Sequence, residues 1–212
     1  ERWAPTTIPA QSTITLAGAT AVSCAAVAGH TLAGSTVALQ YWTGAAWANI
    51  VAGKLITDNS PIMWIFPART ATIFRLNISA SPGLPEIAVF KIGNPLQMPV
   101  SIFGGHGPIE YGRKTALRSN RSDTGEYLGR TKQRMALATD FAWQHLPRAW
   151  VTTNWKALQQ AIEAEPFFIA WRPYDSQSVG YCQTDEVPPV QNMGVRDFMS
   201  ASLSVRGLAD YG

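Results

Sequence analysis

Hydrophobic positions along this chain repeat mostly with a period of two. Val37, Leu39 and Tyr41 alternate with small or polar residues, and residues 73–78, 137–143 and 199–206 repeat the pattern. A period of two places the apolar side chains on one face of a β-strand. The sequence therefore predicts a series of half-buried strands.

Clusters of turn-forming residues separate these strands in the first half of the chain. They stand at residues 29–34, 43–46, 58–61 and 81–85, and Gly, Pro, Asn and Asp are the residues that turns favour. We expect six or seven short strands at a spacing of roughly 8–15 residues, which is typical of a β-sandwich or jelly roll. 

Two boundaries inside this series follow from particular residues. Residues 6–18 are expected as an extended arm or an edge strand, separate from a small-residue strand at 21–28. Pro67 lies between the apolar runs 62–66 and 73–78, and proline cannot donate to a β-ladder. These two runs are therefore expected as separate strands.

One segment has helical spacing. Trp155, Leu158 and Ile162 recur at three- and four-residue intervals, and Pro166 follows. Such spacing gives one apolar stripe on a helix, and Thr153 or Asn154 could cap its start. The sequence predicts one helix over residues 154–165, followed by a buried strand at 167–171.

These patterns predict a mainly all-β fold of two β-sandwich or jelly-roll domains, the second with one α-helix packed on it. Residues 1–95 form the first domain, residues 96–112 are a connector rich in Gly and Pro, and residues 113–212 form the second domain.

The charge is modest overall but unevenly distributed. The chain carries a net charge of +3, with 46% hydrophobic and 15% charged residues. Residues 113–134 hold seven Lys and Arg against two acidic residues. We interpret this stretch as a basic arm for contacts with another protein, and a solvated loop is the alternative. The subunit-interface candidates are Arg113, Lys114, Arg118, Arg121, Arg130 and Arg134. Nucleic-acid binding is not expected, because few aromatic residues interleave with the charges.

The cysteines and the hydropathy exclude two further classes. Cys24 and Cys182 are far apart and lie outside any CxxC motif, so we expect buried thiols rather than a disulfide framework. No window holds the roughly 18 apolar residues that span a bilayer. No membrane span is therefore expected.

No constellation for catalysis can be assembled. His30, His106 and His145 fall in different elements, and none has a metal ligand at suitable spacing. The chain has neither a GxSxG elbow nor a GxGxxG loop. We therefore expect no enzyme, no catalytic residue, no metal and no cofactor.

Aromatic residues suggest a binding surface instead. Tyr41, Trp42 and Trp47 flank the turn at residues 43–46, and aromatic faces can stack on sugar rings. They are the glycan-contact candidates. Packing in the core or in the hairpin explains the same residues, and the sequence alone favours it.

Several segments resemble tail proteins of tailed bacteriophages. In the first domain these are residues 26–32, 37–42, 58–62, 74–78 and 87–93, which resemble a discoidin-like, galactose-binding-type jelly roll. In the second domain, residues 120–122, 125–130, 166–173 and 194–197 are similar to the same proteins.

The resemblance implies a structural subunit of a phage tail tip or baseplate. Such a subunit would assemble as a ring, contact other tail proteins and reside in the virion after synthesis in the host cytoplasm. The alternative is a host-surface glycan-binding module of the tail. Here the first domain departs from sugar-binding relatives, since it has few of the Arg, Asp or Asn side chains that hold sugar hydroxyls.

Overall fold

The computed structural model describes residues 2–102, 105–109, 112–176, 178–194 and 197–207. Side chains of Arg113, Thr115, Ala116 and residues 133–136 lie outside the description as well. The fold is mainly β, with strands in two sheets and one helix. Contacts divide the chain into two units, residues 1–95 with 170–179 and residues 96–169 with 180–209. The all-β, two-domain prediction is confirmed.

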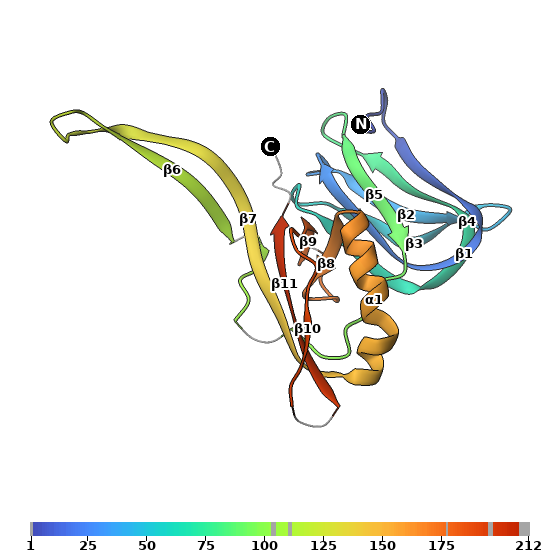
Figure 1. Ribbon diagram of the computed structural model, residues 1–212. Helices are drawn as coiled ribbons and strands as arrows, with labels where there is room; N and C mark the ends of the chain where they lie inside the picture. Colours follow the sequence, from blue (N-terminus) through green and yellow to red (C-terminus); the bar gives the residue numbers. More distant parts are fainter. Residues whose placement is uncertain (1, 103–104, 110–111, 177, 195–196, 208–212) are drawn as a thin grey trace. The chain divides into compact units, whose positions relative to one another are not determined.

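The first unit contains one five-stranded antiparallel sheet. Its strands, in the order β3-β2-β4-β1-β5 across the sheet (Figure 1), are β1 (Ala10–His30), β2 (Thr36–Trp42), β3 (Trp47–Leu55), β4 (Ile62–Ala80) and β5 (Ile87–Gly93).

The five-stranded sheet folds into a sandwich of two layers, and the long strands β1 and β4 run through both layers. The first part of β1 pairs with residues 73–78 of β4, and its second part pairs with residues 62–71 and with β5. Strands β2 and β3 extend only the first layer. The expected breaks after residue 18 and at Pro67 are therefore wrong, because both strands continue from one layer into the other.

Pro67 is tolerated because it lies in a β-bulge. The register of β1 and β4 shifts between Val22 and Cys24, opposite residues 66–68 of β4. A bulge leaves a residue without a ladder partner, so the missing N–H of Pro67 costs no hydrogen bond. The bend that the bulge allows carries the sheet into the second layer.

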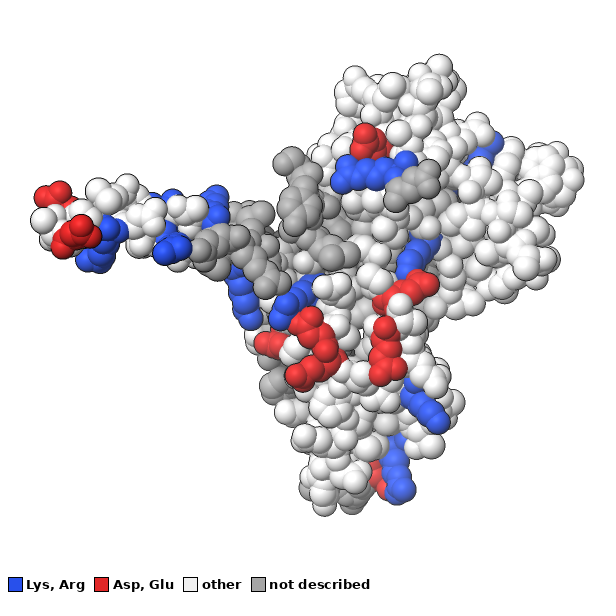
Figure 2. All heavy atoms as spheres, turned by 45° about the horizontal axis from the view of Figure 1, so that its top comes forward, with Lys and Arg blue, Asp and Glu red and all other residues white. Residues whose placement is uncertain are grey.

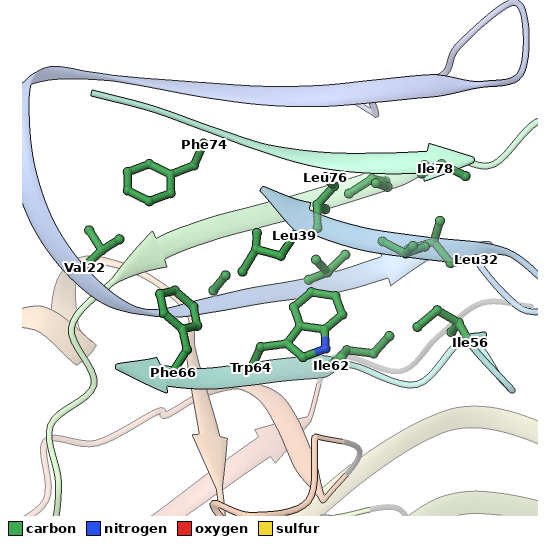
Figure 3. Packing of buried hydrophobic residues seen from close by; sticks show 14 of the residues in the cluster. Val22, Leu32, Leu39, Ile56, Ile62, Trp64, Phe66, Phe74, Leu76 and Ile78 are labelled. Carbon is green, nitrogen blue, oxygen red and sulfur yellow. The ribbon is translucent and has the colours of Figure 1, made fainter. Parts of the chain in front are cut away.

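The core of the first unit fills the space between the two layers. Figure 3 shows Phe74, Leu76 and Ile78 of one half of β4 pointing toward Trp64 and Phe66 of the other half. Phe74, Leu76 and Ile78 are fully buried. Alternation then places Arg75 and Asn77 on the opposite, outer side of the first layer.

The second unit contains a six-stranded sheet and the helix. Its main strand order is β6-β7-β11-β9-β8, and β10 pairs with β11. The bounds are β6 (Arg113–Arg121), β7 (Tyr127–Pro147), α1 (Arg148–Ala164), β8 (Phe167–Ala170), β9 (Val179–Gln183), β10 (Val190–Asn192) and β11 (Phe198–Gly207).

The alternation predicted for the second unit is confirmed. Phe141 and Trp143 of β7 are buried, as are Leu203 and Val205 of β11, while Ser204 is exposed. 

The basic stretch forms a β-hairpin, and the alternative of a solvated loop is wrong. Strand β6 pairs with residues 127–137 of β7, and β11 pairs with residues 137–147. The first half of β7 therefore has β6 as its one described neighbour. Residues 113–134 form a two-stranded ribbon (Figure 1), called the basic hairpin below.

The helix begins six residues before its expected start. It follows Pro147, which has φ −61°, and no side chain caps it. Thr153 and Asn154 lie inside the helix, where their side chains donate to the carbonyl oxygens of Ala149 and Trp150. Their predicted capping role is wrong, because Pro147 already sets a backbone angle suited to a helix start. Val151, Trp155 and Ile162 are the buried residues.

Both cysteines are free and buried, as expected. Burial raises the pKa of the Cys24 thiol to about 11 and that of Cys182 to about 12. Within the described part of the chain, no helix has the length and apolar character needed to cross a membrane.

Candidate ligand-binding face

The outer side of the first layer carries a connected row of polar side chains. Arg75 on β4 pairs with Gln40 on β2, and Gln40 pairs with Asn49 on β3. On the other side of β4, Arg75 lies opposite Thr13 of β1, two residues from Gln11. Four strands thus contribute to one row, which spans ~14 Å at the usual strand spacing.

Hydrogen bonds join these side chains into one network. The Arg75 Nε donates to Gln40 Oε1 at 2.7 Å, and Nη1 donates to Gln11 Oε1 at 2.6 Å. Gln40 Nε2 donates in turn to Asn49 Oδ1 at 2.8 Å. The network therefore holds each side chain in a defined position on the open face.

Two tryptophans lie at the end of the same face. Trp42 ends β2 and pairs with Trp47 at the start of β3. Their ring centroids are 5.3 Å apart and the rings meet edge to face. The Arg75 guanidinium lies 3.8 Å from the centroid of Trp47. We call this surface the platform, and it consists of Gln11, Gln40, Trp42, Trp47, Asn49 and Arg75.

A tight turn brings the tryptophans together. Thr43 donates its backbone N–H to the Ala46 oxygen at 3.0 Å, and its hydroxyl accepts from the Ala46 N–H at 3.1 Å. Gly44 has φ +98°, a conformation that side chains rarely adopt. The turn closes the hairpin and fixes the register in which Trp42 and Trp47 meet.

Of the three predicted glycan-contact residues, the structure brings Trp42 and Trp47 together on the platform. Tyr41 points the other way and packs against the core of the first unit. The alternation of Val37, Leu39 and Tyr41 in the sequence already placed Tyr41 on the same face as the other two residues. Glycan contact by Trp42 and Trp47 stays a prediction.

Sequence reasoning missed the polar half of the platform. Arg75, Gln11 and Gln40 are distant in sequence, and they meet because β1 and β2 both flank β4. The sequence expectation was that this domain has few Arg, Asp or Asn side chains for sugar hydroxyls, and the network adds Gln11 and Gln40 to Arg75 and Asn49. The alternation of residues 73–78 predicts that Arg75 points away from the core. Which residues lie beside it depends on the order of the strands, which the local sequence does not show.

Partial burial lowers the pKa of the Arg75 guanidinium below its ordinary value. The salt bridges of the described residues join Arg2 to Glu86, Arg148 to Asp197 and Arg206 to Asp185. None of them involves Arg75, so no described carboxylate neutralises it.

The predicted subunit-interface residues lie on the basic hairpin. Lys114, Arg118, Arg121 and Arg130 are exposed, and none forms a salt bridge with another described residue. The side chains of Arg113 and Arg134 lie outside the described residues. Figure 2 shows basic side chains along the hairpin and acidic ones at its tip. A subunit contact through these residues stays a prediction.

The histidines have separate structural surroundings. His30 is buried at the end of β1, where its Nε2 lies 2.9 Å from the Ser60 oxygen and its Nδ1 accepts from the Leu32 N–H at 3.3 Å. His106 packs on Phe141, and His145 packs on Phe198. Among the described residues, no group of three His, Cys, Asp or Glu side chains is placed to hold a metal.

No protein-family model matches this chain, and no curated protein matches it. Among solved structures, a pectin-binding carbohydrate-binding module is similar over 46% of this chain and 75% of its own, with 16% sequence identity and a TM-score of 0.37. A similarity of this size carries no argument about the ligand. The resemblance to phage tail proteins has no counterpart in these comparisons and stays a prediction.

Proposed function

We propose that this protein is a non-enzymatic glycan-binding module and that the platform is its binding face. The observation that carries the proposal is the position of an aromatic pair at the end of a hydrogen-bonding row on one open sheet face. Sugars need both parts, because a pyranose ring presents an apolar C–H face and a rim of hydroxyl groups.

The aromatic part supports stacking on the C–H face of a sugar. The guanidinium of Arg75 covers Trp47 at 3.8 Å, so we assign the stacking surface to Trp42. Both rings are half-buried, which holds them in place while part of each ring stays accessible. An ordered aromatic ring loses little conformational entropy when a ligand binds.

The polar part supports contacts with the rim of the ring. Each primary amide carries two N–H donors, and the network uses one of those on Gln40 and, among bonds to other described residues, neither of those on Gln11 or Asn49. The remaining donors are positioned by the network and available to sugar oxygens. The row is longer than one sugar ring, which favours a polymer over a monosaccharide.

A glycan array with a multimeric, fluorescent preparation of the full chain tests this proposal. Binding to at least one glycan class is expected, and Trp42→Ala should weaken it roughly tenfold or more, as for a central aromatic contact. Tyr174→Ala is the matched control, since Tyr174 is an 88% exposed aromatic residue that is not one of the platform residues. An array without signal, or equal losses in both variants, would contradict the proposal.

The basic hairpin favours a second function, that of a subunit in a larger assembly such as a phage tail tip. Lys114, Arg118, Arg121 and Arg130 have no salt-bridge partner among the described residues, and Leu117, Tyr127 and Leu128 are exposed on the same ribbon. A ribbon with positive charges and apolar residues suits an acidic surface on a partner subunit, because opposite potentials attract and apolar contacts exclude water.

Electron microscopy and sedimentation of the purified chain test the second function. A closed ring is expected, and the triple variant R118E/R121E/R130E should remain folded but monomeric. The control variant R69E/K156E/R172E reverses three exposed cations outside the hairpin and should still assemble. A wild-type chain that stays monomeric at all concentrations would refute assembly from copies of this chain.

A further inference from the structure

We infer that the platform selects glycans that carry carboxylate groups and that Arg75 receives the carboxylate. This inference rests on the proposed glycan-binding function and narrows its ligand class. It depends on how Arg75 is held, which of its N–H groups remain, and what surrounds its charge.

The guanidinium of Arg75 is held from three directions. Gln40 and Gln11 accept hydrogen bonds from it on two sides, and the ring of Trp47 lies against its face. A free arginine side chain loses rotamer entropy when a ligand fixes it. In Arg75 the fold has already fixed the side chain, so a ligand would find it in place.

Three of the five N–H groups of the Arg75 guanidinium make no hydrogen bond to another described residue. The guanidinium has one N–H on Nε and two on each Nη, and the network uses Nε and one on Nη1. Both N–H groups of Nη2 and one of Nη1 make no hydrogen bond to another described residue. Adjacent N–H groups on the two Nη atoms match the two oxygens of a carboxylate.

The spare groups of the platform are mainly donors. The side-chain oxygens of Gln11, Gln40 and Asn49 each already accept one hydrogen bond, whereas amide N–H groups remain on all three residues. A hydroxyl group both donates and accepts, but a carboxylate only accepts. A face with surplus donors therefore favours carboxylate over a neutral sugar rim.

The charge of Arg75 is also uncompensated. Its platform neighbours are amides and indoles, and none of the described carboxylates forms a salt bridge with it. A cation without a neighbouring counter-ion leaves its attraction available to an anionic ligand. The adjacent Trp42 ring, 5.3 Å from Trp47, would hold the sugar that bears the carboxylate.

Alginate and its carboxyl-reduced form are a suitable pair of probes, since reduction converts each uronate into a neutral hexose on the same backbone. Isothermal titration of the full chain should give an affinity for alginate at least about tenfold higher than for the reduced polymer. Arg75→Gln should remove this preference. Arg75→Lys should keep only part of it, because an ammonium group is a point charge without a fork.

Two variants separate this effect from charge alone and from misfolding. Arg69→Gln removes an exposed cation from the same strand outside the network and should keep the full preference. Gln11→Ala retains the charge of Arg75 but removes one support, and it should reduce the preference.

The outcomes distinguish this inference from the proposed function. Equal binding of both polymers by the wild type would overturn the carboxylate inference and leave glycan binding intact. An equal loss in Arg69→Gln and Arg75→Gln would also overturn it, since that would show unspecific attraction between charges. If neither polymer binds and the glycan array is also blank, the proposed function fails together with the inference.

Discussion

The outward faces of strands carry arginine in both units, yet the surroundings of these residues differ. Arg75 lies on a sheet face that covers a packed core, where two amide oxygens and an indole ring hold its guanidinium. Arg118 and Arg130 lie on a two-stranded ribbon, where no described residue holds them in this way. The same residue type can therefore serve oriented recognition in one place and unoriented attraction in the other.

The difference follows from what lies beneath each face. Under the platform, Phe74 and Leu76 are fully buried and fix the positions of β4 and its neighbours. The hairpin has one strand pair, and its residues Leu117 and Leu128 are exposed. A lone pair of strands is marginally stable in water. Orientation of a side chain on a strand thus depends on burial on the opposite face.

Truncating one apolar residue in each region should give the largest difference between the two regions in the free energy of unfolding. Phe74→Ala is expected to lower the free energy of unfolding of the first unit by about 3–5 kcal/mol, because it opens a cavity in a filled core. Leu117→Ala, at a 46% exposed position, should change that of the second unit by less than about 1 kcal/mol. Urea denaturation measures both values, and similar losses would contradict the contrast.

Removing an aromatic residue from each region should have a smaller effect. Trp47→Ala deletes the contact with Arg75 and the edge-to-face contact with Trp42, which together contribute about 1–2 kcal/mol. Tyr127→Ala, at a 60% exposed position of the hairpin, should stay within about 0.5 kcal/mol. Thermal unfolding followed by tryptophan fluorescence and circular dichroism would record these changes.

Acid should affect the first unit through His30, whereas the basic hairpin contains no histidine. Burial lowers the pKa of His30 below 6.5, and this effect exceeds the opposing ones of the Ser60 carbonyl group and the Asp58 charge. The neutral form is favoured in the folded state, so its contribution is present above pH 6.5 and is lost as the pH falls through the folded-state pKa.

The variant His30→Gln reveals the pH-dependent contribution of His30 to stability, which is the smallest of the expected effects. Relative to it, the wild type should lose stability as the pH falls below 6.5, and the two stability curves should run parallel above pH 7.5. Denaturation at a series of pH values measures the difference. A constant difference over the whole range would show that His30 does not couple folding of the first unit to pH.

Several elements could be predicted because their signals are local. Alternation at residues 73–78 and 199–206 indicates which side chains face the core, and burial confirms it. The apolar spacing of Trp155 and Ile162 indicates the helix. Its start was missed because the helix follows Pro147 and has no side-chain cap, whereas the sequence analysis looked for one.

Other features depend on partners that the local sequence does not show. Pro67 looks like the end of a strand, but a bulge at the register shift between Val22 and Cys24 accommodates it and the strand continues. The polar, glycine-containing stretch 113–134 looks like a loop or an arm, and backbone pairing between β6 and β7 makes it a ribbon. In both cases the pairing of distant strands outweighs the local preference.

The sequence by itself determined the all-β class, the inward and outward faces of most strands and the location of the basic charge, because these follow from periodicity and composition. Only the tertiary structure decided that Arg75 meets Gln11, Gln40 and Trp47. That meeting requires β4 to lie between β1 and β2 in a particular register. Strand order and register come from packing two layers around one core, and no single segment of the sequence specifies them.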